Sequence, residues 1–325
     1  MARNLEKSMK KIFIFLLFII GVFGAIYFQM GGESKSPDRQ ITLAEPGSVW
    51  WNAPILVAGP DQFYEDAGVD VTRFEVTTGL ASKNAVVQEN ADVGVSASTP
   101  LVVAASRDED LLVLGRYMLS TSLLGIITQD QEINWKEKIG YVPATISELY
   151  LIAYLEKNNL LDLYTKKELN LVGFRPTGLK PAFVRKDVQS VVGFEPFISQ
   201  ILDAAESGNK FNLVKDEAIF SHAGFILTRR DVWEKKKDDV EAFLSAIKAV
   251  STQISQNEKE FQSKIEELFD YEKGWLDDTF QKVDFSYSDK LVDVKPILER
   301  EAELAVRAGI IATAPDFTKV LSELK

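Results

Sequence analysis

The sequence predicts an α/β fold of two lobes, each built on a mainly parallel sheet flanked by helices. Short apolar strands alternate with helices along most of the chain, in two separate series. One local pattern also occurs twice, at residues 89–100 and 185–197: a polar helix end, a short apolar strand, and a polar loop followed by proline. Proline favours the first position of a helix, and open α/β sheets bind ligands in loops at the carboxyl ends of their strands. Two such loops predict a molecule held between two lobes.

The first series begins after residue 39. We expect strands at residues 40–44, 69–75, 93–95 and 111–114, separated by helices at residues 52–67, 80–89 and 99–106. Strands that alternate with helices of this length indicate parallel βαβ units. A further apolar strand at residues 123–128 is expected to leave this first lobe.

The second series has the same character. We expect strands at residues 138–142, 169–173 and 190–193, and helices at residues 147–158, 179–185 and 196–205. A strand at residues 225–228 then returns to the first lobe. The predicted division is therefore 40–128 plus 224–325 for lobe one and 129–223 for lobe two, with a hinge near Thr128 and Gly224.

The remainder of the chain is predicted to be helical. From Val232 onward apolar residues recur at helical spacing, for example at Val240, Phe243, Leu244 and Ile247. The last helices, at residues 298–308 and 317–324, are expected to pack on lobe one.

Residues 1–39 are predicted to be an export segment rather than part of the fold. Basic residues between positions 3 and 11 precede an unbroken apolar run at residues 12–28, and a polar linker follows. A basic flank before an apolar run is typical of an export signal with a cytoplasmic N-terminus. The run is at the short limit for a bilayer span, which needs about 17–25 residues. We interpret it as an uncleaved membrane anchor, because Phe23 makes the small residues around it a poor cleavage site.

The composition excludes several classes of function. The formal net charge is −11, which argues against nucleic-acid binding, because that needs clustered Lys and Arg. The chain has no Cys and therefore no disulfide, no thiolate metal site and no lipidated cysteine. His222 is the only histidine, and a metal site built on histidine usually needs more than one. We expect no metal and no cofactor.

Several short motifs resemble those of one family. They are residues 58–60 (Ala-Gly-Pro) with Phe63, 67–71 (Ala-Gly-Val-Asp-Val), 91–94 (Ala-Asp-Val-Gly) with Pro100, 188–197, and 307–311 (Arg-Ala-Gly-Ile-Ile). In order and spacing they are similar to the substrate-binding proteins of bacterial ABC importers of the nitrate, sulfonate, taurine and thiamine-pyrimidine type. The resemblance covers about residues 40–320.

This resemblance implies a type II periplasmic-binding fold, in which two α/β lobes close on a ligand without chemistry. It also implies a small organic ligand (a sulfonate, a carboxylate or a pyrimidine-like molecule), an ABC permease as partner, and an extracytoplasmic location. The chain departs from the family in lacking a lipidation cysteine and in its loop at residues 48–52, which fits no one subfamily. A membrane-tethered sensor of the same ligand is the alternative.

Trp50 and Trp51 lie in that loop, just before the predicted helix cap Asn52. One indole is expected to form a flat wall against which a planar ligand stacks, while the other covers the helix. Packing of both indoles between the lobes is the alternative. We predict a ligand with a planar end, because a bare inorganic anion needs donors and positive charge more than it needs indoles.

Hydroxyl groups follow one strand in each lobe. Ser96, Ser98 and Thr99 lie at a predicted helix start, where free N–H groups and hydroxyls suit a carboxylate, sulfonate or amide oxygen. Thr99 also suits ordinary N-capping before the proline. In the second lobe, residues 145–148 have capping-box spacing, which leaves Ser147 as the freer group for a ligand.

Glu195 occupies the second of the two repeated loops. Its carboxylate is predicted to accept from a ligand N–H or hydroxyl, and binding of N–H groups at its own helix start is the alternative. Arg116 and Tyr117 follow a predicted strand and are expected to reach the cleft. The arginine favours an anion there, with a surface ion pair as the alternative.

A serine hydrolase is the competing hypothesis. Residues 94–98 (Gly-Val-Ser-Ala-Ser) nearly match the nucleophile elbow G-x-S-x-G at a strand-to-helix turn, with Ser96 as the nucleophile. His222 follows in the chain, and Asp203 or Asp216 is available as the acid. The final glycine of the motif is replaced, however, and a motif without its context is a weak hypothesis. We expect no enzymatic activity.

Overall fold

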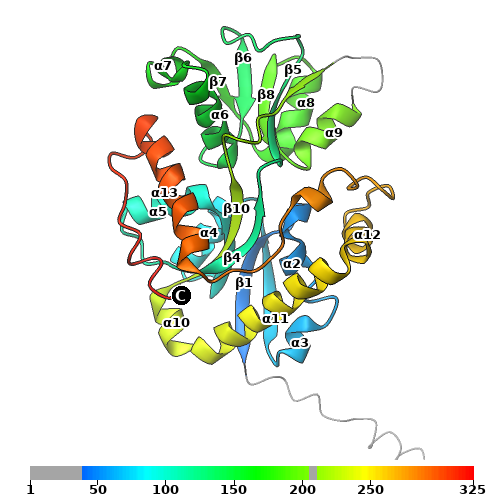
Figure 1. Cartoon of the computed structure of the whole chain (residues 1–325), viewed down its shortest axis with the longest axis vertical. Helices are drawn as coiled ribbons and strands as arrows, with labels where there is room; N and C mark the ends of the chain where they lie inside the picture. The colour runs from blue at the N-terminus through cyan, green and yellow to red at the C-terminus, as the bar shows by residue number, and fades with distance from the viewer. Residues whose placement is uncertain (1–38, 205–210) are drawn as a thin grey trace, which may run out of the picture. The chain divides into compact units, whose positions relative to one another are not determined.

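The computed structural model describes residues 39–204 and 211–325. These residues form two five-stranded sheets flanked by helices (Figure 1). We call each sheet, with the helices that pack on it, a lobe. The predicted two-lobed α/β fold is confirmed. The apolar run at residues 12–28, predicted to be a signal or anchor, lies outside the described residues.

The first sheet is mainly parallel. Its strand order is β2–β1–β3–β10–β4; β1 is parallel to β2 and β3, whereas β10 is antiparallel to β3 and β4. The strands are β1 (Gln40–Pro46), β2 (Asp70–Val76), β3 (Val93–Ala97), β4 (Leu112–Ser120) and β10 (His222–Thr228). The central strands are apolar along their length because helices cover both faces of the sheet.

The second sheet repeats this plan. Its order is β7–β6–β8–β5–β9; β6 is parallel to β7 and β8, whereas β5 is antiparallel to β8 and β9. The strands are β5 (Leu124–Thr128), β6 (Lys138–Tyr141), β7 (Asn170–Gly173), β8 (Ser190–Phe194) and β9 (Asn212–Val214). The one antiparallel strand of each sheet is thus the strand that enters it from the other lobe.

Two connections join the sheets, one between β4 and β5 and one between β9 and β10. The predicted crossings near Thr128 and Gly224 therefore fall inside β5 and β10 rather than in the connections. The boundary at residue 128 was misplaced because β5 is as apolar as the strands before it. Only its pairing with β8 assigns it to the second sheet.

Helices of the first lobe come from both ends of the described chain. They are η1 (Trp50–Asn52), α2 (Ala53–Leu56), α3 (Phe63–Asp66), α4 (Gly79–Val87), α5 (Ser98–Ser106), α10 (Arg230–Lys235), α11 (Lys237–Gln256), α12 (Glu258–Leu268), η3 (Phe280–Lys282) and α13 (Leu291–Arg307). The predicted amphipathic face of α11 packs on α2, α3 and β1. The expected packing of C-terminal helices on lobe one is therefore present, and α13 also contacts the second lobe.

The second lobe has fewer helices among its described residues. They are α6 (Ile146–Lys157), α7 (Leu161–Thr165), η2 (Pro176–Gly178), α8 (Leu179–Val184) and α9 (Phe197–Asp203). None of the described helices in either lobe is long and apolar enough to cross a membrane.

Several predicted elements differ from the structure in their bounds or type. The helix expected at residues 52–67 is broken into η1, α2 and α3, because Pro60 has no N–H to donate and Gln62 adopts a left-handed φ of 64°. Turns replace the helix expected at residues 317–324. The strand expected at residues 111–114 extends as β4 to Ser120, because polar residues that suggested a loop pair with β10.

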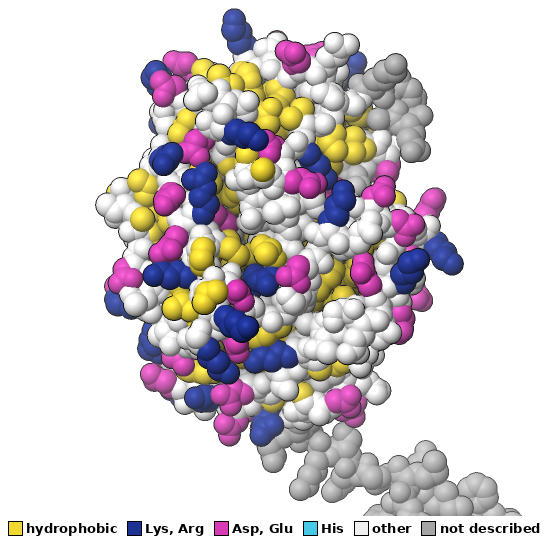
Figure 2. Space-filling model, in the orientation of Figure 1, with side chains coloured by type: hydrophobic (Ala, Val, Ile, Leu, Met, Phe, Trp, Pro, Cys, Tyr) yellow, Lys and Arg dark blue, Asp and Glu magenta, His cyan; other side chains and the backbone are white. Residues whose placement is uncertain are grey.

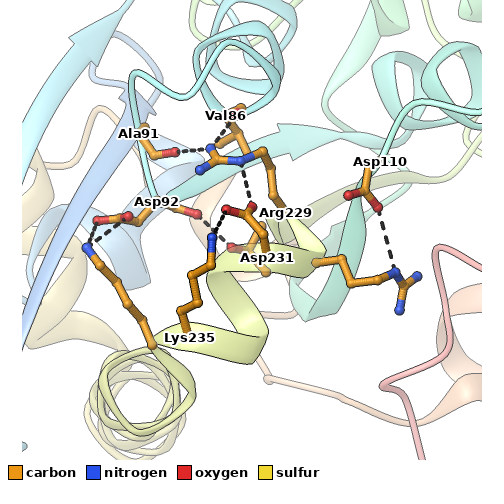
Figure 3. Close-up of polar contacts among 10 residues, drawn as sticks. Val86, Ala91, Asp92, Asp110, Arg229, Asp231 and Lys235 are labelled. Carbon is orange, nitrogen blue, oxygen red and sulfur yellow. Dashed lines mark hydrogen bonds and ion pairs between the residues drawn. The ribbon is translucent and has the colours of Figure 1, made fainter.

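A polar network fixes α10 and α11 to the end of the first sheet where β3 begins (Figure 3). The Arg229 guanidinium donates to the carbonyl oxygens of Val86 (2.6 Å) and Ala91 (3.1 Å). The Asp92 carboxylate accepts from Lys236 Nζ (2.9 Å) and from the backbone N–H of Thr42 (2.9 Å). These contacts lie at the amino end of β3, whereas its carboxyl end borders a pocket.

Candidate ligand-binding site

A pocket with about 530 Å³ of empty space, including its open mouth, lies between the carboxyl ends of strands from both sheets. Pro46 ends β1 and Ala97 ends β3 on one side, while Phe194 ends β8 on the other. None of the described residues that line the pocket is Asp, Glu, Lys, Arg or His. A ligand here would therefore meet apolar and aromatic surface, hydroxyl groups and main-chain N–H groups.

Helix starts supply those N–H groups from both lobes. Thr78 caps α4 by accepting from the N–H of Ala81 (3.1 Å), and Gly79 follows it on the pocket wall. Thr145 caps α6 by accepting from the N–H of Ser147 (3.2 Å), and Ile146 follows it in the same way. The first N–H groups of a helix have no partner inside the helix, so they can bind an anionic or carbonyl oxygen of a ligand.

Gly79 at the start of α4 packs closely against the end of β3. A Cβ atom at Gly79 would lie 3.0 Å from Ser96 Oγ and 3.1 Å from the main-chain nitrogen of Ala97. The absence of a side chain at Gly79 therefore favours the close approach of the helix start to the end of β3. The residues at positions 77–80 were not among the predicted site residues, although they follow a predicted strand as Ser96 does.

Of the two neighbouring tryptophans, only Trp51 lines the pocket. Its indole N–H donates to the main-chain oxygen of Glu195 in the other lobe (3.0 Å), and its ring makes an edge contact with His222 at 4.6 Å between centroids. Trp50 is fully buried and packs on Phe280 at 5.8 Å. Trp51 is therefore part of the pocket wall, whereas Trp50 is a core residue.

Asn52 and Tyr117 also line the pocket and bond to each other. The Tyr117 hydroxyl donates to Asn52 Oδ1 (2.6 Å), and Asn52 Nδ2 donates to the carbonyl oxygen of Pro46 (2.9 Å). The Asn52 side chain thus links the end of β1 to the Tyr117 side chain of β4 rather than capping its helix. Burial raises the pKa of Tyr117 well above its ordinary value, so its phenol stays protonated.

Of the three predicted hydroxyl residues Ser96, Ser98 and Thr99, only one lines the pocket. Ser96 lines the pocket, and its Oγ donates to the carbonyl oxygen of Ala97 (3.1 Å). Ser98 and Thr99 are outside the pocket lining and bond the carboxyl group of Glu301, Thr99 at 3.1 Å. Thr99 is not the N-cap, because the helix already begins at Ser98.

Glu301 is a buried acid that sequence reasoning missed. Its side chain is 2% exposed, and burial raises its pKa to about 8, although the hydrogen bonds from Ser98 and Thr99 oppose this shift. Nothing near Glu301 in the sequence marked it, because its partners lie about two hundred residues earlier.

Ser147 and Glu195, both predicted to contact the ligand, are buried outside the pocket lining. Ser147 Oγ donates to the carbonyl oxygen of Val192 (2.8 Å) and accepts from the N–H of Val142 (3.1 Å). The Glu195 carboxylate accepts from the N–H of Ser199 (3.2 Å), which is the second of the two interpretations offered by the sequence. Burial raises the pKa of Glu195.

Arg116 is not part of the pocket lining either. Its guanidinium lies 3.3 Å from Asp284 Oδ2, and its backbone pairs with Ser288, so that it holds the segment before α13 against β4. Arg116 therefore forms an ion pair, which was the alternative to anion binding that the sequence left open.

The hydrolase geometry is not formed in the described part of the chain. Ser96 Oγ donates to a neighbouring carbonyl group, and neither nitrogen of the buried His222 has a hydrogen-bond partner among the described residues. Burial lowers the pKa of His222 to about 3. The described residues also hold no cluster of His, Asp and Glu that would suit a metal ion.

Comparisons with known proteins agree with this architecture. The sequence model described as NMT1/THI5 like matches residues 52–260. No curated protein sequence matches the chain.

Solved structures with the same fold cover most of the chain. The alkanesulfonate-binding protein SsuA from Xanthomonas axonopodis pv. citri, bound to MOPS, has a TM-score of 0.70 at 15% identity, covering 87% of this chain and 96% of that one. The nitrate-binding protein NrtA from Synechocystis PCC 6803 has a TM-score of 0.68 at 13% identity, covering 89% of this chain and 87% of that one. A Candida albicans protein described as having the generic periplasmic binding protein fold has a TM-score of 0.68 at 13% identity, covering 88% of this chain and 96% of that one. The resemblance inferred from the sequence motifs is confirmed, as is the periplasmic-binding fold.

Proposed function

Because the chain belongs to the NMT1/THI5-like family, we propose that it is an extracytoplasmic solute-binding protein that captures a small organic ligand and delivers it to an ABC importer. The observation that carries the proposal is the pocket itself. Its walls come from both lobes and from the carboxyl ends of β1, β3 and β8. A ligand in it would touch both lobes and would favour the arrangement in which they are closed.

The lining indicates the kind of ligand. Trp51, Phe194 and Phe197 supply aromatic surface, and Ser96, Thr78 and Thr145 supply hydroxyl groups. We propose a molecule with a flat or apolar body and one polar end, such as a sulfonate, a carboxylate or a pyrimidine. The body would lie against Trp51, and the polar end would be bound by the hydroxyls and the first N–H groups of α4 and α6.

Binding without chemistry is the simplest activity that this site supports. An acyl-transfer site needs a nucleophile hydrogen-bonded to a base, and Ser96 instead donates to the carbonyl oxygen of Ala97. In this proposal residues 12–28 direct the protein to the outer face of the cytoplasmic membrane and anchor it there, and the two connections between the sheets act as the hinge.

The test is a thermal-shift screen of the full chain against MOPS, benzenesulfonate, benzoate, cytosine and nitrate, followed by calorimetry. A ligand that binds only the folded state stabilises it by about 2.7 kcal/mol at a hundredfold excess over Kd. We expect stabilisation by at least one organic compound of the panel. Stabilisation by nitrate alone would contradict the proposed ligand class, and stabilisation by none would contradict the proposal as stated.

A further inference from the structure

Helix α13 contacts helices that line the pocket from both lobes. It packs on α5 of the first lobe and on α6 of the second (Figure 1). Residues at the starts of these two helices form part of the pocket wall: Ala97 just before α5 and Pro100 in its first turn, and Thr145 just before α6 and Ile146 in its first turn. Helix α13, which lies outside the pocket, therefore contacts one pocket-lining helix from each lobe.

On the first lobe the contact is made by Glu301, whose carboxyl group bonds the hydroxyls of Ser98 and Thr99 in the first turn of α5. These two residues lie between pocket-lining neighbours, Ala97 before them and Pro100 after them. Through these two hydrogen bonds the buried Glu301 holds the first turn of α5 against α13.

On the second lobe the contact is made by the residue next to Glu301. Arg300 Nη2 lies 2.9 Å from Glu156 Oε2, and Arg307 Nη1 lies 2.5 Å from Glu156 Oε1. Glu156 belongs to the last turn of α6, and its side chain is 19% exposed. Partial burial tends to raise its pKa, but the two guanidinium groups hold the pKa below its ordinary value, so it is charged at neutral pH.

We propose that Glu156, Arg300 and Arg307 are positioning residues that set ligand affinity from outside the pocket. This inference rests on the proposed function. Because α6 is a continuous helix, a shift of Glu156 at its last turn also moves Thr145 and Ile146 at its start, where they line the pocket. Separation of the lobes about their two connections would pull Glu156 away from α13. The ion pairs therefore favour the arrangement that encloses a ligand, and a ligand specific for that arrangement binds more tightly when it is more populated.

The binding experiment compares Glu156→Gln with Glu299→Gln in the full chain. Glu299 lies on α13 and, among the described residues, pairs only with Lys295 of that helix (3.5 Å), so its substitution removes the same charge without breaking a contact to the second lobe. With MOPS, benzoate and cytosine as calorimetric probes, we expect Glu156→Gln to weaken binding about five- to tenfold and Glu299→Gln to change it less than about twofold. In the Arg300→Met/Arg307→Met background, Glu156→Gln should cause no further loss, because its partners are gone.

A second measurement needs no ligand. Because the chain has no Cys, spin labels can be placed at Glu65→Cys in the first lobe and Lys136→Cys in the second without background. We expect Glu156→Gln to shift the distance distribution between the labels to longer values, and Glu299→Gln to leave it unchanged. An unchanged distribution in Glu156→Gln overturns the inference even if no probe binds. Equal affinities of Glu156→Gln and the parent, or losses that add in the triple variant, overturn it as well. Failure of the parent to bind any probe counts instead against the proposed ligand class.

Discussion

The indole N–H of Trp51 donates to the main-chain oxygen of Glu195, 3.0 Å away and 144 residues later in the chain. This hydrogen bond joins the loop after β1 to the loop after β8 and so crosses from one lobe to the other. It fixes the edge of the Trp51 ring, while the ring itself remains part of the pocket wall. Glu195 contributes through its backbone, and its carboxylate stabilises the start of its own helix.

Replacement of Trp51 by Ala should weaken binding of the probe found in the screen by about tenfold or more, which is about 1.4 kcal/mol. The substitution removes both the aromatic wall and the bond to Glu195. Trp51→Phe keeps an aromatic ring and loses the bond, so its affinity should lie between those of the parent and Trp51→Ala. Calorimetry measures all three, and parental affinity in Trp51→Ala would show that the indole only packs.

Replacement of Trp50 by Ala should act on stability instead. Trp50 is fully buried and packs on Phe280, and removal of a buried aromatic side chain costs about 3–5 kcal/mol. Urea unfolding followed by circular dichroism gives the free energy of unfolding. A loss below about 1 kcal/mol would contradict the assignment of Trp50 to the core.

Replacement of Gly224 by Ala should disturb the pocket through Tyr117. A Cβ atom there would lie 2.6 Å from Tyr117 Cζ, so Tyr117 and its bond to Asn52 must shift, at a cost of about 1–3 kcal/mol. Gly59→Ala is the matched control, because its Cβ would meet no atom closer than 3.8 Å. Chemical denaturation should show the difference between the two variants, and equal stabilities would contradict the crowding at β10.

Glu301 should make stability depend on pH. Its folded-state pKa is about 8, above the ordinary value of 4.5, so the folded chain holds a proton that the unfolded chain has lost between these values. The stabilising contribution is fully present below about pH 4.5 and is lost as pH rises through about 8. Relative to Glu301→Gln, whose amide does not titrate, the parent should lose up to about 1.4 kcal/mol per pH unit across this window. A difference in unfolding free energy that does not change between pH 5 and 8 would refute this.

A reporter fusion tests the predicted topology. Alkaline phosphatase fused after residue 39 should be active, because the basic flank before residue 12 favours a cytoplasmic N-terminus and an external linker. A cytoplasmic reporter at the same position is the control, and activity of that reporter alone would reverse the predicted orientation.

The sequence by itself determined the plan of the fold. Strand and helix periodicity, with proline and hydroxyl residues at helix starts, depends on neighbours within a few positions, so the two alternating series could be predicted. The same local signals identified Trp51, Asn52 and Ser96 as residues at strand ends, and the structure places all three on the pocket wall. The unbroken helix expected at residues 52–67 shows the limit, because Pro60 and the left-handed Gln62 interrupt it.

Only the tertiary structure decided which polar groups line the pocket and which form hydrogen bonds outside it. Ser98 and Ser96 are alike in sequence, but Ser98 bonds Glu301, 203 residues later, and Ser96 stays at the pocket. Likewise, the partner of Trp51 is a main-chain oxygen, an atom that every residue carries, so no sequence pattern can mark it. Such pairings depend on how α13 and the second lobe pack against the first, and that packing is set by the sum of many apolar contacts rather than by any local motif.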